Sequence, residues 1–85
     1  MSYNVKILRR AQKELADLPK ETHLKICDAV QDLARDSRPS GCLKLKSREG
    51  WRIRVGNYRV LYKIDYQQQI ITIVHIGHRR DVYDK

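Results

Sequence analysis

Three arginines in the second half of the chain have the spacing of a shared anion site. Arg52 and Arg54 alternate with apolar residues before a Gly-Asn pair, and Arg59 follows that pair. If Gly56 and Asn57 form the two-residue loop of a β-hairpin, Arg54 lies opposite Arg59, and Arg52 shares their face of the sheet. Like charges so placed repel each other, so this face needs full solvation or a bound anion. Because guanidinium forks match phosphate oxygens, we favour a phosphate site over a merely polar surface.

The last residues of the chain carry a second group of side chains that could do chemistry. A β-branched run over residues 69–76 predicts a strand that Gly77 closes, and residues 78–83 read His-Arg-Arg-Asp-Val-Tyr. Functional side chains commonly follow strand ends on a rigid scaffold. The alternative is a disordered basic terminus, although its Val and Tyr can both pack. An imidazole group commonly titrates near neutrality, so His78 is a candidate proton carrier, with a solvated turn residue as the plainer interpretation.

The first half of the sequence predicts the elements that must support these groups. Residues 2–8 alternate between apolar and polar, as a strand does. From Arg10 onward apolar residues recur at helical spacing, and Pro19 separates this first helix from a second one over residues 20–35. The two helices form a hairpin. The expected apolar stripe of the second helix consists of Leu24, Ile26, Cys27, Val30, Leu33 and Ala34.

The second half of the sequence is dominated by strand signals. Residues 43–46 alternate briefly, and three longer strands are predicted over residues 51–55, 58–64 and 69–76. The resulting order is β-α-α-β-β-β, which indicates an α+β fold: an antiparallel sheet with the helical hairpin packed on one face. We expect residues 1–85 to form a single domain.

The composition points to a polyanionic partner. The chain carries 18 Lys and Arg residues against 10 Asp and Glu residues, a formal net charge of +8. Nucleic acid is the natural partner for such an excess, and an acidic protein fits as well. No stretch suits a membrane span or a signal peptide. Cys27 and Cys42 form neither a disulfide framework nor a zinc site, so we expect a cytoplasmic protein without metal or cofactor.

Two sequence strings together resemble a known family. They are W-R-I-R-V-G-N-Y-R-V-L-Y at residues 51–62 and G-H-R-R-D-V-Y at residues 77–83, preceded by L-K-L at residues 43–45. The chain resembles the RelE/ParE toxin superfamily over nearly its whole length. The resemblance to the RelE branch implies a toxin of a type II toxin–antitoxin system. Such a toxin enters the ribosomal A site, cleaves the bound messenger RNA, and is held inactive by a cognate antitoxin.

The resemblance also implies which residues act in the reaction. Matched position by position, the catalytic residues are Arg52, Arg54, Arg59, Arg79 and Tyr83. Well-known members carry lysines at the first two of these positions. A lysine can lose its proton to act as a base, whereas an arginine effectively cannot. We further expect contacts with RNA from Lys44, Lys46, His78 and Arg80.

The expected reaction is a metal-independent attack of the ribose 2′-hydroxyl on the adjacent phosphate. Expected partners are the antitoxin, the ribosome with its RNA, and messenger RNA. We expect no membrane partner, and contact with DNA only through the antitoxin. Two alternatives remain. The ParE branch inhibits DNA gyrase without cutting RNA, and would need neither the full arginine cluster nor Tyr83. An RNA-binding module would stack bases on exposed aromatic residues, but Trp51, Tyr58 and Tyr62 fall on the predicted core face.

Overall fold

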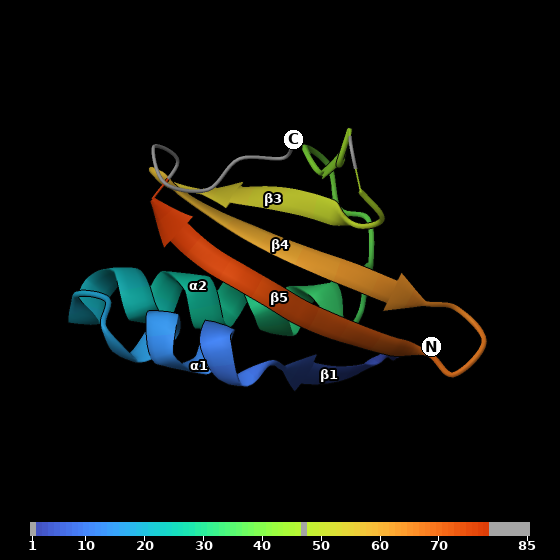
Figure 1. The fold of residues 1–85 in the computed structure, drawn as a ribbon, viewed down its shortest axis with the longest axis horizontal. Helices are drawn as coiled ribbons and strands as arrows, with labels where there is room; N and C mark the ends of the chain where they lie inside the picture. Colours follow the sequence, from blue (N-terminus) through green and yellow to red (C-terminus); the bar gives the residue numbers. More distant parts are fainter. Residues whose placement is uncertain (1, 47, 79–85) are drawn as a thin grey trace.

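One five-stranded sheet and two helices make up the fold. The computed structural model describes residues 2–46 and 48–78. Its elements, in chain order, are β1 (Asn4–Ile7), α1 (Arg9–Ala16), α2 (Lys20–Leu33), β2 (Leu43–Lys44), β3 (Trp51–Val55), β4 (Tyr58–Asp65) and β5 (Ile70–His78). The strands lie in the order β1-β5-β4-β3-β2. Figure 1 shows both helices on one side of the sheet, which confirms the predicted α+β fold with a helical hairpin on one face.

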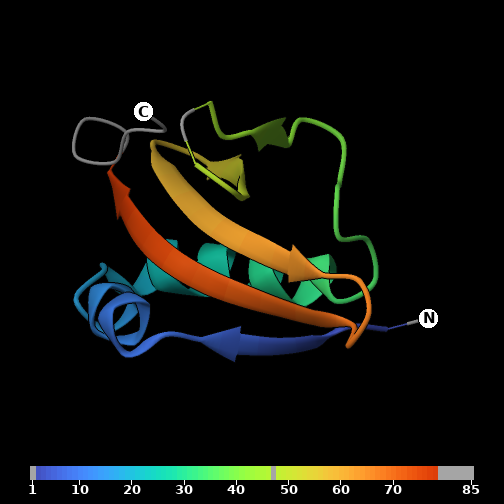
Figure 2. The same cartoon turned by 45° about the vertical axis from the view of Figure 1, so that its right-hand side comes forward.

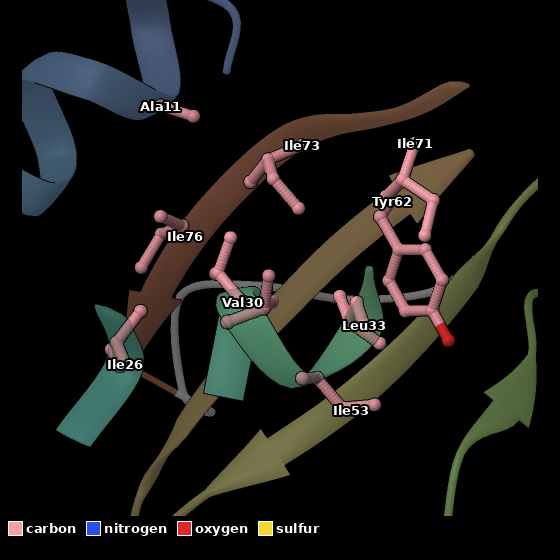
Figure 3. Close-up of a cluster of buried hydrophobic side chains, with 10 residues drawn as sticks. Ala11, Ile26, Val30, Leu33, Ile53, Tyr62, Ile71, Ile73 and Ile76 are labelled. Atoms are coloured by element: carbon pink, nitrogen blue, oxygen red, sulfur yellow. The ribbon is translucent and has the colours of Figure 1, made fainter. Parts of the chain in front are cut away.

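The core lies between the sheet and the two helices (Figure 3). Its side chains come from both layers, and burying each large aliphatic one contributes about 1.5–3 kcal/mol. The Tyr62 ring is fully buried among them, and its hydroxyl donates a 2.8 Å hydrogen bond to the backbone oxygen of Ser37. The buried members of this cluster are Ala11, Ile26, Val30, Leu33, Ile53, Val60, Tyr62, Ile71, Ile73 and Ile76.

The predicted antiparallel sheet has one parallel pairing, at the edge that β1 forms. β1 pairs in parallel with β5, with Asn4 opposite Ile70 and Ile7 opposite Ile73. The other three pairings, β2 with β3, β3 with β4 and β4 with β5, are antiparallel. Figure 2 shows β1, in blue, running beside β5, in red. Alternation along a strand reveals its two faces but carries no information about the direction of its neighbour.

Three other element predictions need correction. The short segment at residues 43–46 contributes a strand of its own, so the predicted order lacked β2. β5 does not end at Ile76 but continues through Gly77 to His78, because Arg59 of β4 pairs with Gly77. Leu24 lies outside the core with 56% of its surface exposed. It is two residues, or about 200°, away from the buried Ile26 around the helix.

The β3–β4 hairpin has the predicted register. Val55 lies opposite Tyr58, and Arg54 lies opposite Arg59. Gly56 has a φ of +61°, the left-handed conformation that tight hairpin turns require and that glycine adopts without steric cost. In the described part of the chain, no helix is long and apolar enough to cross a membrane.

Candidate functional site

The three arginines of the hairpin lie on the sheet face that the helices leave uncovered. Arg54 is directly opposite Arg59, and Arg52 is opposite Leu61 on the neighbouring strand. Directly opposite residues have Cβ atoms ~5 Å apart, so the three guanidinium groups can reach a common ligand. Arg54 is exposed, whereas Arg52 and Arg59 are half-buried. We call these three residues the arginine patch.

The arginine patch is held on a rigid support. The residues that alternate with it point to the helices, where Ile53 of β3 is 7% exposed and Val60 of β4 is fully buried. Both belong to the main core cluster. A slip of the hairpin by one residue would expose these side chains, so the core fixes the register and with it the spacing of the arginines. Charges fixed in advance around an anion cost no reorganisation when the anion binds.

Arg52 has an apolar neighbour on each side of its strand. Leu43 of β2 and Leu61 of β4 are its partners across the sheet, and Leu61 is almost fully buried. A guanidinium group that is partly shielded from water attracts an anion more strongly than a fully solvated one. Arg52 is therefore suited to bind a phosphate close to an apolar surface.

A bulge in β5 places His75 in line with Arg52 and Leu61 across the sheet. Leu61 pairs with His75 and Tyr62 pairs with Ile73, so Val74 is an extra residue in the ladder. His75 thus lies on the same row as Arg52, two strands away. Its Nδ1 lies 2.7 Å from a carboxylate oxygen of Glu14, and the Arg10 guanidinium approaches its Nε2 at 3.3 Å. These two contacts engage both nitrogens of the ring.

Glu14 joins α1 to the edge of the sheet, a role that the sequence analysis did not find. Its second carboxylate oxygen accepts a 2.9 Å hydrogen bond from the backbone N–H of Ile76. The pairing of β1 with β5 ends at Ile7 and Ile73. Glu14 therefore accepts a hydrogen bond from a backbone N–H of β5 that lies beyond the last residue paired with β1. The pairing of Glu14 with His75 spans 61 positions, and no local pattern in the sequence signals it.

Two predicted RNA contacts lie on the other face of the sheet. Lys44 pairs with Trp51, and its Nζ lies 5.3 Å from the centre of the Trp51 ring. His78 pairs with Tyr58, and the two rings meet edge to face with their centroids 5.5 Å apart. Neither side chain therefore shares the face of the arginine patch.

The remaining predicted residues fall beyond the strands or beyond the described residues. Lys46 follows β2 and is exposed. Arg79, Arg80 and Tyr83 lie outside the described residues. The described chain ends at His78, one residue after the position that pairs with Arg59.

Comparison with known sequences gives consistent matches. A family model described as the ParE toxin of type II toxin–antitoxin systems matches residues 5–83. A protein named RelE1 from Methanocaldococcus jannaschii is 31% identical, over 98% of this chain and 97% of its own. Toxin RelG from Mycobacterium tuberculosis is also 31% identical, over 98% of both chains.

Solved structures show the same fold. A chain of the archaeal RelE–RelB complex from Pyrococcus horikoshii superposes with a TM-score of 0.84 at 27% identity, covering 96% of this chain and 100% of that chain. A chain of the toxin–antitoxin complex RelBE2 from Mycobacterium tuberculosis gives a TM-score of 0.82 at 26% identity, covering 93% of this chain and 100% of that one.

Proposed function

We propose a specific activity for this chain, which belongs to the RelE/ParE superfamily of toxins from type II toxin–antitoxin systems. It is an endoribonuclease that cleaves messenger RNA in the ribosomal A site without a metal ion. The observation that carries the proposal is the arginine patch, in which Arg54 directly faces Arg59 on the sheet face opposite the helices. Phosphate is the anion whose charge and oxygen geometry best match converging guanidinium groups.

The proposed reaction is a transesterification. The ribose 2′-oxygen forms a bond to phosphorus and loses its proton, while the bond from phosphorus to the 5′-oxygen breaks and that oxygen gains a proton. The products are a 2′,3′-cyclic phosphate and a 5′-hydroxyl end. Arg52, Arg54 and Arg59 stabilise the negative charge that grows on the phosphate oxygens. Fixed charges of this kind commonly supply the largest share of a rate enhancement.

Arg79 and Tyr83 complete the proposed site, with Arg80 as a further contact to RNA. Their assignment rests on the resemblance of residues 77–83 to the family motif. Arg79 adds a further positive charge, and Tyr83 orients the RNA by stacking or hydrogen bonding, or moves a proton. Lys44 and His78 have no place at the cleaved phosphate in this proposal, because they lie on the opposite sheet face.

The ribosome is a necessary partner in the proposed reaction. Arginine keeps its proton at neutral pH, so the patch stabilises charge but does not accept the proton of the 2′-hydroxyl. Bending of the messenger in the A site places the 2′-oxygen in line with the phosphate. Such positioning lowers a barrier by up to roughly 7–11 kcal/mol. We therefore expect slow cleavage of free RNA.

We further propose that a cognate antitoxin restrains this toxin in the cytoplasm, where translating ribosomes are found. The RelE–RelB and RelBE2 structures are toxin–antitoxin complexes, and this chain shares their fold. The net charge of +8 suits an acidic partner segment. Such a segment blocks the toxin by placing a carboxylate on the arginines, by displacing the C-terminal residues, or by its bulk.

The decisive test is cleavage on programmed ribosomes. Purified protein is mixed with ribosomes that hold a defined messenger, and the ends of the cleaved RNA are identified. We expect cuts within the A-site codon, a 2′,3′-cyclic phosphate, and much slower cutting of the same RNA without ribosomes. An intact messenger would overturn the proposal, and rapid cutting of free RNA by pure protein would overturn the role of the ribosome.

One observation favours a second candidate function. The matching family model is described as a ParE toxin, and the ParE branch inhibits DNA gyrase. A supercoiling assay with purified gyrase distinguishes the two functions. Inhibition of gyrase together with an intact messenger would favour the ParE function. We prefer the nuclease because all three hairpin arginines are present on one face of the sheet.

A further inference from the structure

A small hollow opens on the sheet beside the arginine patch. Its volume is about 130 Å³. Its lining comes from the loop after β2, from β4, including Tyr62, and from the bulge of β5, and we call its charged residues the rim. The apolar residues are Leu45, Leu61 and Val74, and the charged residues are Arg48, Glu49 and Lys63. We call this feature the Leu61 hollow.

The Leu61 hollow and the arginine patch share one residue pair. Leu61 lines the hollow and lies directly opposite Arg52 of the patch. Neighbouring strands are ~4.8 Å apart, so the hollow begins one strand away from the guanidinium groups. A nucleotide carries its base and its phosphate on a single ribose. One nucleotide can therefore place its phosphate on the patch and its base over the hollow.

The size and lining of the hollow suit a flat ring with polar edges. An apolar cavity of roughly 150 Å³ takes up a single benzene ring, and the Leu61 hollow is of similar size, about 130 Å³. Its charged rim carries hydrogen-bond donors and acceptors, which can pair with the polar edge of a base. The Glu49 carboxylate accepts hydrogen bonds, whereas Arg48 and Lys63 donate them.

Two backbone features fix the wall of the hollow. The backbone N–H of Leu45 donates a 3.0 Å hydrogen bond to the oxygen of Gly50, which closes the loop above β4. Gly50 has a φ of +131°, and a Cβ atom at that position would lie 2.9 Å from the backbone oxygen of Tyr62. Only glycine fits this close approach without a shift of the backbone. The sheet and this loop together fix the shape of the hollow.

We infer that the Leu61 hollow binds one nucleobase adjacent to the cleaved phosphate and thereby sets the base preference of the cut. This inference rests on the proposed nuclease function and adds a specificity subsite to it. The base enters with its ring against Leu61 and Val74, and its polar edge meets the charged rim. Leaving a buried polar group unpaired is costly, so bases that match the rim poorly are cut more slowly.

The first test fills the hollow. Val74→Phe places a ring inside it without changing any arginine, and Gln67→Phe in the exposed β4–β5 turn is the matched control. Cut sites are mapped by sequencing on ribosomes that carry a library of A-site codons. We expect Val74→Phe to change the relative cutting of the four bases at one position by about tenfold, and the control to reproduce the wild-type pattern.

A second test measures binding without cleavage and without the bulky substitution. Methyl resonances of wild-type protein are followed by NMR during titration with a 2′-O-methyl dinucleotide, which cannot be cleaved. The comparison ligand has the same backbone but lacks the bases. We expect the methyl groups of Leu61 and Val74 to shift with the base-bearing ligand only. Shifts that are equal with both ligands would overturn the inference.

The outcomes separate the inference from the function on which it rests. If wild-type protein leaves the messenger intact on ribosomes, the proposed nuclease function fails. If wild-type protein cuts and Val74→Phe cuts with an unchanged base preference, the Leu61 hollow is not a base subsite. Glu49→Gln gives a further check, because it keeps the shape of the rim and removes one charge. We expect it to reorder the preferred bases.

Discussion

Arg54 and Arg59 face each other directly across β3 and β4, one residue pair before the Gly56-Asn57 turn. Like charges in directly opposite positions cost roughly 0.2–1 kcal/mol. The hairpin keeps this register because the opposite faces of both strands carry buried side chains, among them Ile53 and Val60. An anion between the two guanidinium groups turns their repulsion into a shared attraction.

This relationship predicts that activity and stability change in opposite directions at Arg54. Arg54→Ala removes an exposed charge from the pair, so we expect ribosome-dependent cleavage to fall about 100-fold. The free energy of unfolding should rise by about 0.2–1 kcal/mol at low salt. Arg59→Ala should also lower cleavage strongly with the fold intact. Cleavage assays and urea unfolding check both effects.

The control for charge alone is Arg35→Ala, because Arg35 is exposed and forms a 2.8 Å surface contact with the exposed Asp32. This variant loses the same charge at a distance from the patch, and its cleavage should match the wild type. Wild-type cleavage by Arg59→Ala would show that the arginine patch does not bind the reacting phosphate.

Glu14 should matter more for stability than its position on a helix surface suggests. Glu14→Ala removes the acceptor of the Ile76 N–H and the partner of His75. We expect a loss of about 1–3 kcal/mol in the free energy of unfolding. Glu14→Gln keeps an acceptor and should lose less. Asp32→Ala, which breaks an exposed ion pair, should cost no more than about 1 kcal/mol. Equal losses in all three variants would contradict this role for Glu14.

The hairpin could be predicted from the sequence because its determinants are local. A Gly-Asn turn and strict alternation on either side fix the faces of Arg52, Arg54 and Arg59 without knowledge of the rest of the fold. The parallel pairing of β1 with β5 depends on residues about 66 positions apart, as with Asn4 and Ile70. Propensity and periodicity describe single segments, so they contain no signal for that contact.

The bulge in β5 explains why the sequence did not predict on which face of the sheet His78 lies. Ile71 and Ile73 point into the core, so strict alternation would place His75 in the core and His78 on the patch face. Val74 is an extra residue in the ladder, and it reverses the alternation after it. Ile76 therefore enters the core, and His78 lies beside Tyr58. A single inserted residue decides on which face a titratable group lies.

Tyr62 should make the protein sensitive to alkaline pH. Burial raises the pKa of its phenol above the usual value of 10, and nearby Cys42 adds to the shift. The unfolded chain therefore loses this proton at a lower pH than the folded protein, so stability falls as pH rises above about 10. We expect Tyr62→Phe to flatten this decline in urea unfolding between pH ~9 and ~11.

The same substitution has a separate cost at neutral pH. Tyr62→Phe leaves the backbone oxygen of Ser37 without the 2.8 Å hydrogen bond from the phenol, which should lower stability by about 1 kcal/mol. Tyr66→Phe is the control, because Tyr66 is 52% exposed. Its alkaline decline should change less than that of Tyr62→Phe, because Tyr66 is the smallest of the causes that raise the Tyr62 pKa. A decline in Tyr62→Phe as steep as in the wild type would assign the effect to other groups.

For the proposed antitoxin, electrostatic attraction should set the association rate, and apolar contacts should set the dissociation rate. The net charge of +8 attracts an acidic partner from a distance, and this attraction is screened over about 8 Å at physiological ionic strength. The association rate with a candidate antitoxin from a neighbouring gene should fall as salt rises. The dissociation rate should change less, because contacts between apolar side chains are insensitive to screening. Kinetic binding measurements at several salt concentrations test both statements.

Two variants of equal charge locate the acidic contact. Arg54→Ala and Arg35→Ala each remove one positive charge, but only Arg54 belongs to the arginine patch, whereas Arg35 follows α2. If the antitoxin places a carboxylate on the patch, Arg54→Ala speeds dissociation and Arg35→Ala leaves it unchanged, while both slow association slightly. Equal dissociation rates in the two variants would mean that the antitoxin places no carboxylate on Arg54, and that it blocks the toxin by displacing the C-terminal residues or by its bulk. A salt-independent association rate would show that the +8 charge is not used for this partner and is better explained by ribosomal RNA.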